Sequence, residues 1–121
     1  DESKKEAVTN LMERLITKDK VTFTLAPYSS GLTLAAAPIV EKYGVLYNSH
    51  GGASNRIFQQ GFSFIVQTLS PASEYQTSPL DLVHKIDPSA KRVAFLFQDN
   101  EFARAVAKGA EAHAKKLGFK V

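Results

Sequence analysis

The spacing of hydrophobic residues predicts several helices along this chain. Between residues 7 and 16 the apolar positions recur in adjacent pairs every four residues, which places them on one face of a helix. Gly44 and Gly118 each follow such a pattern and mark predicted helix ends. Ser70 stands before a proline and marks the start of another predicted helix. The predicted helices cover about 3–16, 32–43, 71–86 and 101–117.

Short runs of β-branched and aromatic residues separate these helices and predict strands. The predicted strands are 21–25, 45–48, 64–68 and 92–97. The run at 92–97 is almost continuously apolar, which is typical of a strand buried on both faces. Strands that alternate with helices of this length predict an α/β fold, with largely parallel strands and helical crossovers.

Composition excludes several protein classes. The 121 residues are 44% hydrophobic and 22% charged, close to the globular average, which excludes disordered and fibrous chains. No apolar run reaches the roughly 18 residues that a membrane span needs. Because cysteine is absent, disulfides, cysteine nucleophiles and zinc–cysteine sites are excluded.

The net charge of +3 does not indicate nucleic-acid binding. The basic excess lies in the last predicted helix and its flanks, where Lys115 and Lys116 complement the negative end of the helix dipole. No aromatic residue interleaves these cations, as stacking on single-stranded nucleic acid would require. We therefore predict no nucleic-acid partner.

No familiar catalytic or metal-binding motif is present: the sequence lacks a nucleophile elbow, a P-loop and a dinucleotide fingerprint. His84 and His113 stand alone on predicted helices, so no metal site and no cofactor is predicted. His50, beside two glycines, could approach a ligand or stay solvated. Asp99 and Glu101 could form an acid–base pair, but carboxylates there more often cap the following helix. We predict no catalytic residue.

Three loops follow the carboxyl ends of predicted strands, at 28–31, 50–54 and 98–102. Ligands of open parallel sheets bind beyond these ends. The first two loops combine serines, glycines and a helix start, which offers free backbone N–H groups and hydroxyls to an anion. A carboxylate fits better than a polyphosphate, because neither loop carries a lysine or arginine ahead of its helix. The serines could equally serve only as helix caps.

Several of these segments together resemble the periplasmic leucine/isoleucine/valine-binding protein family, which supplies solute receptors to ABC importers. The resemblance begins with VTFTLAPYSSG at 21–31 and continues with AAAP at 35–38 and EKYGV at 41–45. The loop GGAS at 51–54 and the passage RVAFLFQDNEF at 92–102 are similar in order and spacing. The opening residues resemble the helix after the family's second strand, so the resemblance covers essentially the whole chain.

The resemblance implies part of a two-lobed, type I periplasmic binding protein fold. Residues 1–70 correspond to the later part of the first lobe, 71–90 to the crossing helix and hinge approach, and 91–121 to the beginning of the second lobe. The strand at 92–97 would then belong to a different sheet from the other three. Because the sequence opens on a helix and stops inside a predicted strand, we expect an internal segment of a longer protein.

The resemblance also implies roles for individual residues. Ser30 matches a serine that binds an α-carboxylate through its hydroxyl and N–H, and the Gly51 carbonyl matches an acceptor for the ammonium. Ala53 stands where a threonine is usual, so either Ser54 replaces the missing hydroxyl or the ligand is held differently. Phe102 matches an aromatic residue that closes over the ligand. The predicted ligand-binding residues are Tyr28, Ser29, Ser30, Gly51, Gly52, Ala53, Ser54 and Phe102.

The function implied is non-enzymatic capture of a branched-chain or hydrophobic amino acid, or a related small carboxylate, between two lobes. Its partner would be the membrane permease of an ABC transporter, and its location the periplasm. The alternative is a ligand-sensing regulatory or receptor domain of the same fold. If the Ser30 hydroxyl and N–H bind a carboxylate, Ser30→Ala in the full-length protein should weaken binding by about 1.5–3 kcal/mol and change the melting temperature without ligand only a little.

Overall fold

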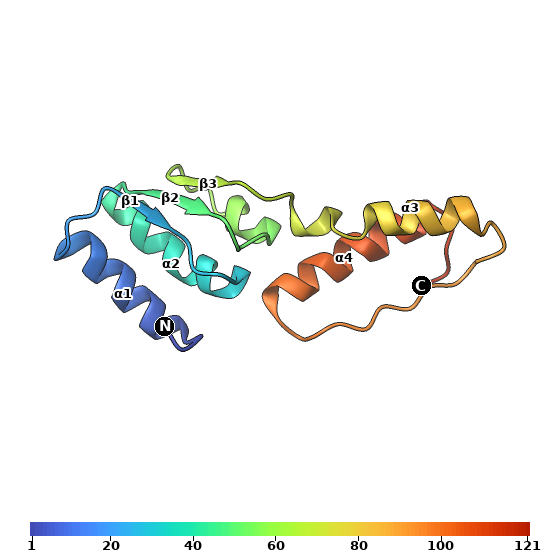
Figure 1. Ribbon diagram of the computed structural model, residues 1–121, viewed down its shortest axis with the longest axis horizontal. Helices are drawn as coiled ribbons and strands as arrows, with labels where there is room; N and C mark the ends of the chain where they lie inside the picture. Colours follow the sequence, from blue (N-terminus) through green and yellow to red (C-terminus); the bar gives the residue numbers. More distant parts are fainter. The chain divides into compact units, whose positions relative to one another are not determined.

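Three short parallel strands form the sheet of this protein, in a computed structural model that describes residues 1–121 (Figure 1). They are β1 (Phe23–Leu25), β2 (Leu46–Ser49) and β3 (Ile65–Gln67), and their spatial order follows their order in the chain. Thr24 pairs with Tyr47, and Tyr47 with Ile65. The predicted parallel arrangement of these strands is confirmed.

Two helices lie on one side of this sheet (Figure 1). They are α1 (Lys5–Thr17) and α2 (Ser30–Tyr43), and the turn η1 (Asn55–Gln59) follows β2. Gly44 ends α2 with a φ of 64°, the left-handed conformation that glycine adopts without a steric cost. Strands joined by helices confirm the predicted α/β class. Together these elements form one compact unit, Asp1–Leu69.

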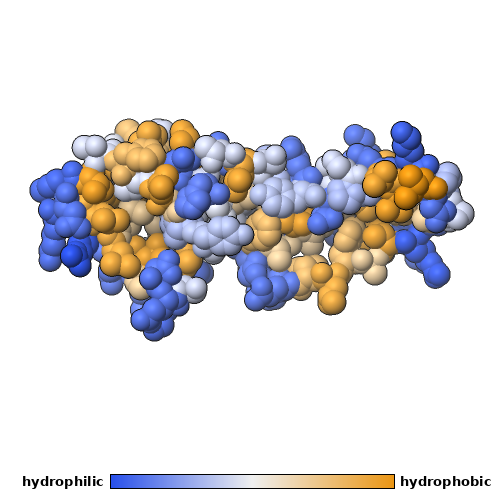
Figure 2. All heavy atoms as spheres, viewed as in Figure 1, coloured by the Kyte–Doolittle hydropathy of each residue, from blue (hydrophilic) through white to orange (hydrophobic).

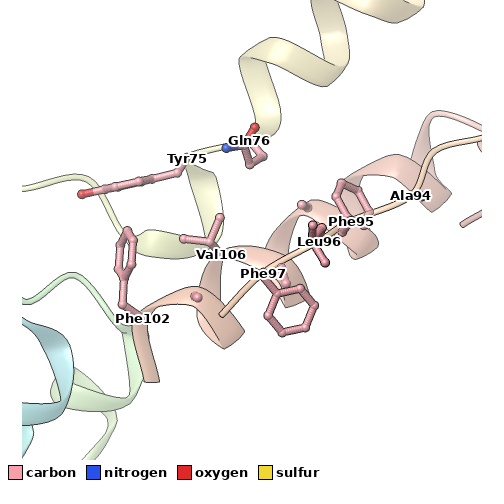
Figure 3. A pocket seen from close by; sticks show the side chains of 11 residues that line it. Tyr75, Gln76, Ala94, Phe95, Leu96, Phe97, Phe102 and Val106 are labelled. Carbon is pink, nitrogen blue, oxygen red and sulfur yellow. The ribbon is translucent and has the colours of Figure 1, made fainter. Parts of the chain in front are cut away.

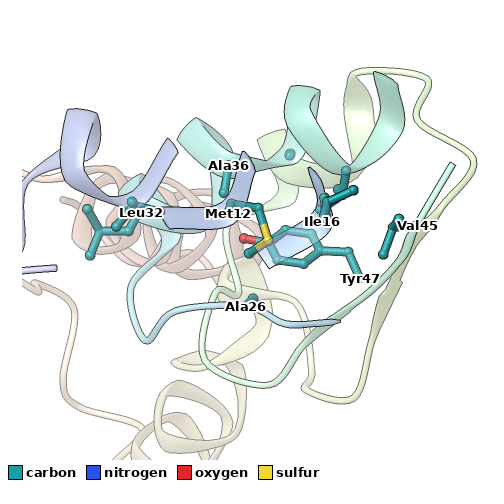
Figure 4. Packing of buried hydrophobic residues seen from close by; sticks show 10 residues of the cluster. Met12, Ile16, Ala26, Leu32, Ala36, Val45 and Tyr47 are labelled. Atoms are coloured by element: carbon teal, nitrogen blue, oxygen red, sulfur yellow. The ribbon is translucent and has the colours of Figure 1, made fainter. Parts of the chain in front are cut away.

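Tyr47 occupies the centre of the hydrophobic core between the sheet and the two helices. Its ring is fully buried beside Met12 and Ile16 of α1 and Ala36 of α2 (Figure 4). The hydroxyl donates a hydrogen bond of 3.3 Å to the carbonyl oxygen of Thr33. Burial raises the pKa of Tyr47 well above its ordinary value, so the phenol stays neutral and remains a donor.

The other face of the sheet is apolar and exposed. Hydrophobic atoms are visible over the strands of this unit in Figure 2. The exposed residues of the strands on this face are Phe23, Leu25, Leu46 and Val66. Among them the side-chain oxygen of Asn48 is buried without a hydrogen-bond partner. Only one of the two faces is therefore covered by helices of this chain.

Residues Ser70–Val121 form a second compact unit. The helix predicted from 71 to 86 is divided into a turn, η2 (Ala72–Glu74), and a helix, α3 (Thr77–Ile86). The last helix, α4 (Glu101–Lys116), packs on both. The core of the unit consists of Leu80, Ala110, Ala114 and Phe119. None of the helices of the chain is both long and apolar enough to cross a membrane.

The strand predicted at 92–97 is not formed as a strand in this chain. Arg92 makes a single parallel bridge with Lys120, and the residues after it have no strand beside them. The side chain of Leu96 is fully exposed and that of Phe97 is half exposed, so the prediction of a strand buried on both faces is wrong here. Hydrophobicity alone does not form a strand, because a ladder needs neighbouring backbone to pair with.

Gly109 allows the backbone of α4 to touch η2, and this contact leads to a first prediction. Glycine inside a helix usually costs about 1 kcal/mol relative to alanine. A Cβ atom on Gly109 would collide with the carbonyl oxygen and Cα of Ser73. Gly109→Ala should therefore destabilise the second unit by about 1–3 kcal/mol, as overpacking does. Hydrogen exchange of the α4 amides measures this.

Gly31 provides the matched control, because a Cβ there would meet only the Ser29 hydroxyl, at 3.9 Å. Gly31→Ala should leave stability unchanged or slightly raised. If Gly109→Ala were as stable as the parent, the close packing of α4 on η2 would be refuted.

A carboxylate shared between α1 and α2 gives a second prediction. Glu13 accepts a hydrogen bond of 2.8 Å from the Tyr43 hydroxyl and lies 3.3 Å from the Lys42 ammonium. These contacts, with Tyr43 first, hold the pKa of Glu13 below its ordinary value of 4.5. The stabilisation is thus present above pH 4.5 and is lost as the pH falls through the lower value in the folded state.

Urea unfolding of the parent and Glu13→Gln as a function of pH tests this assignment. The parent should be the more stable at pH 7, and the difference should shrink in acid. In a Tyr43→Phe background the acid-dependent part should be smaller. A difference that does not depend on pH would contradict the role given to Glu13.

Candidate functional site

The loops that follow β1 and β2 meet at the carboxyl edge of the sheet in the first unit. The loop after β1 runs into the N-terminus of α2, and the loop after β2 runs into η1. Ser30 begins α2, and its hydroxyl oxygen accepts hydrogen bonds from the N–H groups of Ala53 and Ser54, at 3.1 and 3.0 Å. These two hydrogen bonds join residues that are 23 and 24 positions apart in the chain.

Ser30 is 1% exposed, and its oxygen is used twice as an acceptor. Its hydroxyl hydrogen has no acceptor in the protein. At the same helix end the N–H of Leu32 is bonded to the Ser29 hydroxyl and that of Thr33 to the Ser29 carbonyl. The N–H groups of Ser30 and Gly31 have no protein acceptor. One buried hydroxyl and two backbone donors, at the positive end of a 14-residue helix, are therefore available to an anion.

The helix cap is Ser29 rather than Ser30. The Ser29 side chain accepts from Leu32, and its backbone has a φ of 127° and a ψ of 132°, a conformation that glycine normally supplies. The capping alternative considered for the loop serines therefore holds for Ser29. Ser30 instead supports the second loop, so we expect Ser30→Ala to lower the melting temperature, in contrast to the expectation from the sequence.

Two glycines in the second loop lie against the first. A Cβ on Gly51 would come within 2.7 Å of the Tyr28 ring, and a Cβ on Gly52 would collide with the Thr33 side chain. The Gly52 carbonyl accepts a hydrogen bond of 2.6 Å from Ser49, while the Gly51 carbonyl has no protein donor. The sequence indicated these glycines as binding residues, and the structure shows that close packing also requires them.

Ser54 is the residue that could replace the missing threonine hydroxyl. It is buried, and its side chain accepts from the N–H of Arg56, 3.4 Å away, at the start of η1. Its own N–H is bonded to Ser30. The Ser54 hydroxyl oxygen therefore caps η1, and both alternatives for holding a ligand stay predictions.

Phe102 lies in the second unit, on the first turn of α4. Its ring makes an edge contact with Tyr75, with centroids 5.5 Å apart and planes at 72°. Both rings line a cavity of about 410 Å³ with Phe95, Phe97 and several alanines (Figure 3). No charged side chain lines this cavity, so it offers apolar contact but no counter-charge. Sequence reasoning missed Tyr75, because it lies in an unexpected break between two helices.

The remaining polar candidates have structural partners. Asn100 caps α4 by accepting from the N–H of Ala103 at 2.9 Å, so neither Asp99 nor Glu101 is the cap. Asp99 forms an ion pair with Arg104.

The histidines have separate surroundings. His113 lies 2.7 Å from Asp81, the His84 ring contacts the ring of Phe119, and His50 is exposed. No group of three metal-binding side chains comes together.

Comparison with known proteins decides the family. The profile described as "Periplasmic binding protein" matches residues 1–121, the whole chain. The chain belongs to the periplasmic binding protein family. This family comprises solute receptors of ABC transporters.

Curated relatives in this family are considerably longer than the chain. "Leu/Ile/Val-binding protein homolog 8" of Brucella abortus is 24% identical over 120 residues, which cover 93% of this chain and 30% of that protein. "Leu/Ile/Val-binding protein homolog 7" of the same species is 26% identical over 113 residues, which cover 88% of this chain and 28% of that protein. The chain thus spans about 30% of the length of these relatives.

Solved structures confirm the type I periplasmic binding protein fold. A substrate-binding protein from Desulfitobacterium hafniense in complex with Leu has a TM-score of 0.87 at 15% identity, over 100% of this chain and 36% of that one. A solute binding protein from Rhodopseudomonas palustris HaA2, in complex with p-hydroxybenzoic acid, has a TM-score of 0.88 at 19% identity, over 98% of this chain and 31% of that one. A leucine binding protein from Thermotoga maritima has a TM-score of 0.81 at 21% identity, over 97% of this chain and 33% of that one.

The shared acceptor at Ser30 leads to a third prediction. Ser30→Ala leaves the N–H groups of Ala53 and Ser54 buried without a partner, which should lower the free energy of unfolding by about 2–4 kcal/mol. Ser29→Ala, which removes one longer cap bond, should cost about 1 kcal/mol. Urea unfolding compares the two, and a smaller effect at Ser30 than at Ser29 would contradict the assigned bonds.

Proposed function

We propose that this chain is part of the extracytoplasmic solute-binding component of an ABC importer. It binds a branched-chain or hydrophobic amino acid, or a related small carboxylate, and does not transform it. The observation that carries the proposal is the group of donors at the start of α2. The buried Ser30 hydroxyl and the N–H groups of Ser30 and Gly31 have no protein acceptor and suit a carboxylate.

Dipoles rather than ions would hold the ligand in this unit. Tyr28, Ser29, Ser30 and the loop 51–54 carry no charged side chain. Oriented N–H groups and a hydroxyl stabilise a carboxylate strongly once water is excluded, and the unpaired Gly51 carbonyl suits an ammonium group. This set of groups binds and orients, and it contains no nucleophile or proton-transfer pair, which supports a non-enzymatic role.

The proposal assigns the parts of the chain to two lobes that close on the ligand. Residues 1–70 would belong to the first lobe, 71–90 to the crossing helix and hinge approach, and 91–121 to the second lobe. The boundary between the compact units at Leu69 and Ser70 supports the end of the first lobe near residue 70. Phe102 would supply an aromatic contact from the second lobe, and hinge closure would exclude water and strengthen the polar contacts.

Relatives with known ligands support two ligand classes. One similar structure contains Leu and another p-hydroxybenzoic acid, and the curated relatives are named for Leu, Ile and Val. All of these ligands carry a carboxylate beside an apolar group. We place the protein in the periplasm, with a membrane permease as its partner and with no cofactor or nucleic acid.

A fourth prediction tests the carboxylate site in the full-length protein that carries these residues. Ser30→Ala should weaken binding of leucine or 4-hydroxybenzoate by about 1.5–3 kcal/mol, roughly 10- to 150-fold, measured by calorimetric titration. Tyr47→Phe is the control, because it also removes a buried hydrogen bond but lies in the core. Its affinity should match that of the parent.

Two results would overturn the proposed function. One is an affinity that Ser30→Ala leaves unchanged for every carboxylate that binds. The other is recovery of a chemically altered ligand after incubation, which mass spectrometry would detect and which would indicate an enzyme.

A further inference from the structure

Tyr28 is the most exposed aromatic residue of the first unit, although the chain is buried two positions before it and two positions after it. Its side chain is 82% exposed, whereas Ala26 and Ser30, two positions away on either side, are 3% and 1% exposed. A large ring in water contributes little to folding, since its apolar surface stays hydrated. The core of this unit therefore does not explain a tyrosine at this position.

The backbone that carries Tyr28 is nonetheless fixed on both sides. The hydroxyl of Thr33, fully buried, lies 3.1 Å from the Pro27 carbonyl oxygen and 2.9 Å from that of Ser29. Ser29 itself holds an unfavourable conformation, with a φ of 127°. Because the backbone is already fixed, only the side-chain torsions of the ring remain to be ordered on binding, which limits the cost in conformational entropy.

One edge of the ring rests on the loop that also carries the carboxylate site. A Cβ at Gly51 would lie 2.7 Å from Tyr28 Cδ2 and 3.0 Å from its Cα, so only glycine leaves room for this contact. The same loop is bonded to the Ser30 hydroxyl through Ala53 and Ser54. Tyr28 and the free donors of Ser30 therefore flank the same short loop.

We propose that Tyr28 is a specificity-determining residue that selects a carboxylic acid with a flat aromatic ring over an aliphatic one. This inference rests on the proposed function, because it needs the carboxylate to lie at Ser30. A ring anchored there by its carboxylate can stack on the exposed Tyr28 ring. Aromatic pairs gain affinity beyond the area they bury, by about two- to tenfold. An aliphatic chain of equal size gains only the burial.

Benzoate and cyclohexanecarboxylate are the matched probes, because they share the carboxylate and the ring size and differ in flatness and π electrons. Calorimetric titration of the full-length protein should show benzoate binding several-fold more tightly. Tyr28→Leu should weaken benzoate by about two- to tenfold, leave cyclohexanecarboxylate within twofold, and so remove the discrimination. Tyr28→Phe should retain it. Because Tyr28 is exposed, none of these variants should change the melting temperature without ligand.

Titration of the parent with leucine, and of the Ser30→Ala variant with the same acids, separates this inference from the proposed function. Equal binding of the two acids, an equal loss of both in Tyr28→Leu, or binding of leucine alone would overturn the role of Tyr28 and leave the carboxylate site in place. If no carboxylate bound, or if Ser30→Ala affected none of them, the proposed function would fall and the inference with it.

Discussion

The candidate site depends on one oxygen atom, the Ser30 hydroxyl, which accepts from two N–H groups of a distant loop. Through it, the loop after β2 is bonded to the helix after β1. Because Ser30 also begins α2, the residue that supports the loop lies at the positive end of the helix. Under the proposed function, stability and ligand recognition would be coupled in this one side chain, and a substitution here would affect both.

Local sequence patterns predicted the parts of the fold that local interactions determine. The four-residue repeat at 7–16 lies within α1, and Gly44 ends α2 as expected. The pattern failed at 92–97, where strand formation depends on which backbone lies alongside, and Lys120 alone provides a pair. The break at Tyr75 and Gln76 was not located either, because Pro79 indicates an interruption of this segment but lies inside α3, after the break itself.

For the site, residue types were predictable and their bonds were not. Ser-Gly loops at strand ends indicated the edge of the sheet where the loops after β1 and β2 meet, and all the candidates but Phe102 lie in the first unit. Ser29 caps the helix and Ser30 supports the loop, and the second role depends on a partner 23 residues away in the chain. Likewise, Gly109 by itself indicates only a less stable position inside a helix, and its contact with Ser73 becomes apparent only in the structure.

The order of the strands has a kinetic consequence. Each strand pairs with the next one along the chain, between residues about twenty positions apart. Connections of this length close at a modest entropic cost. The sheet can therefore assemble stepwise, β2 on β1 and then β3 on β2, as each segment leaves the ribosome. The edge at which the two loops meet would be in place before synthesis of the second unit had finished.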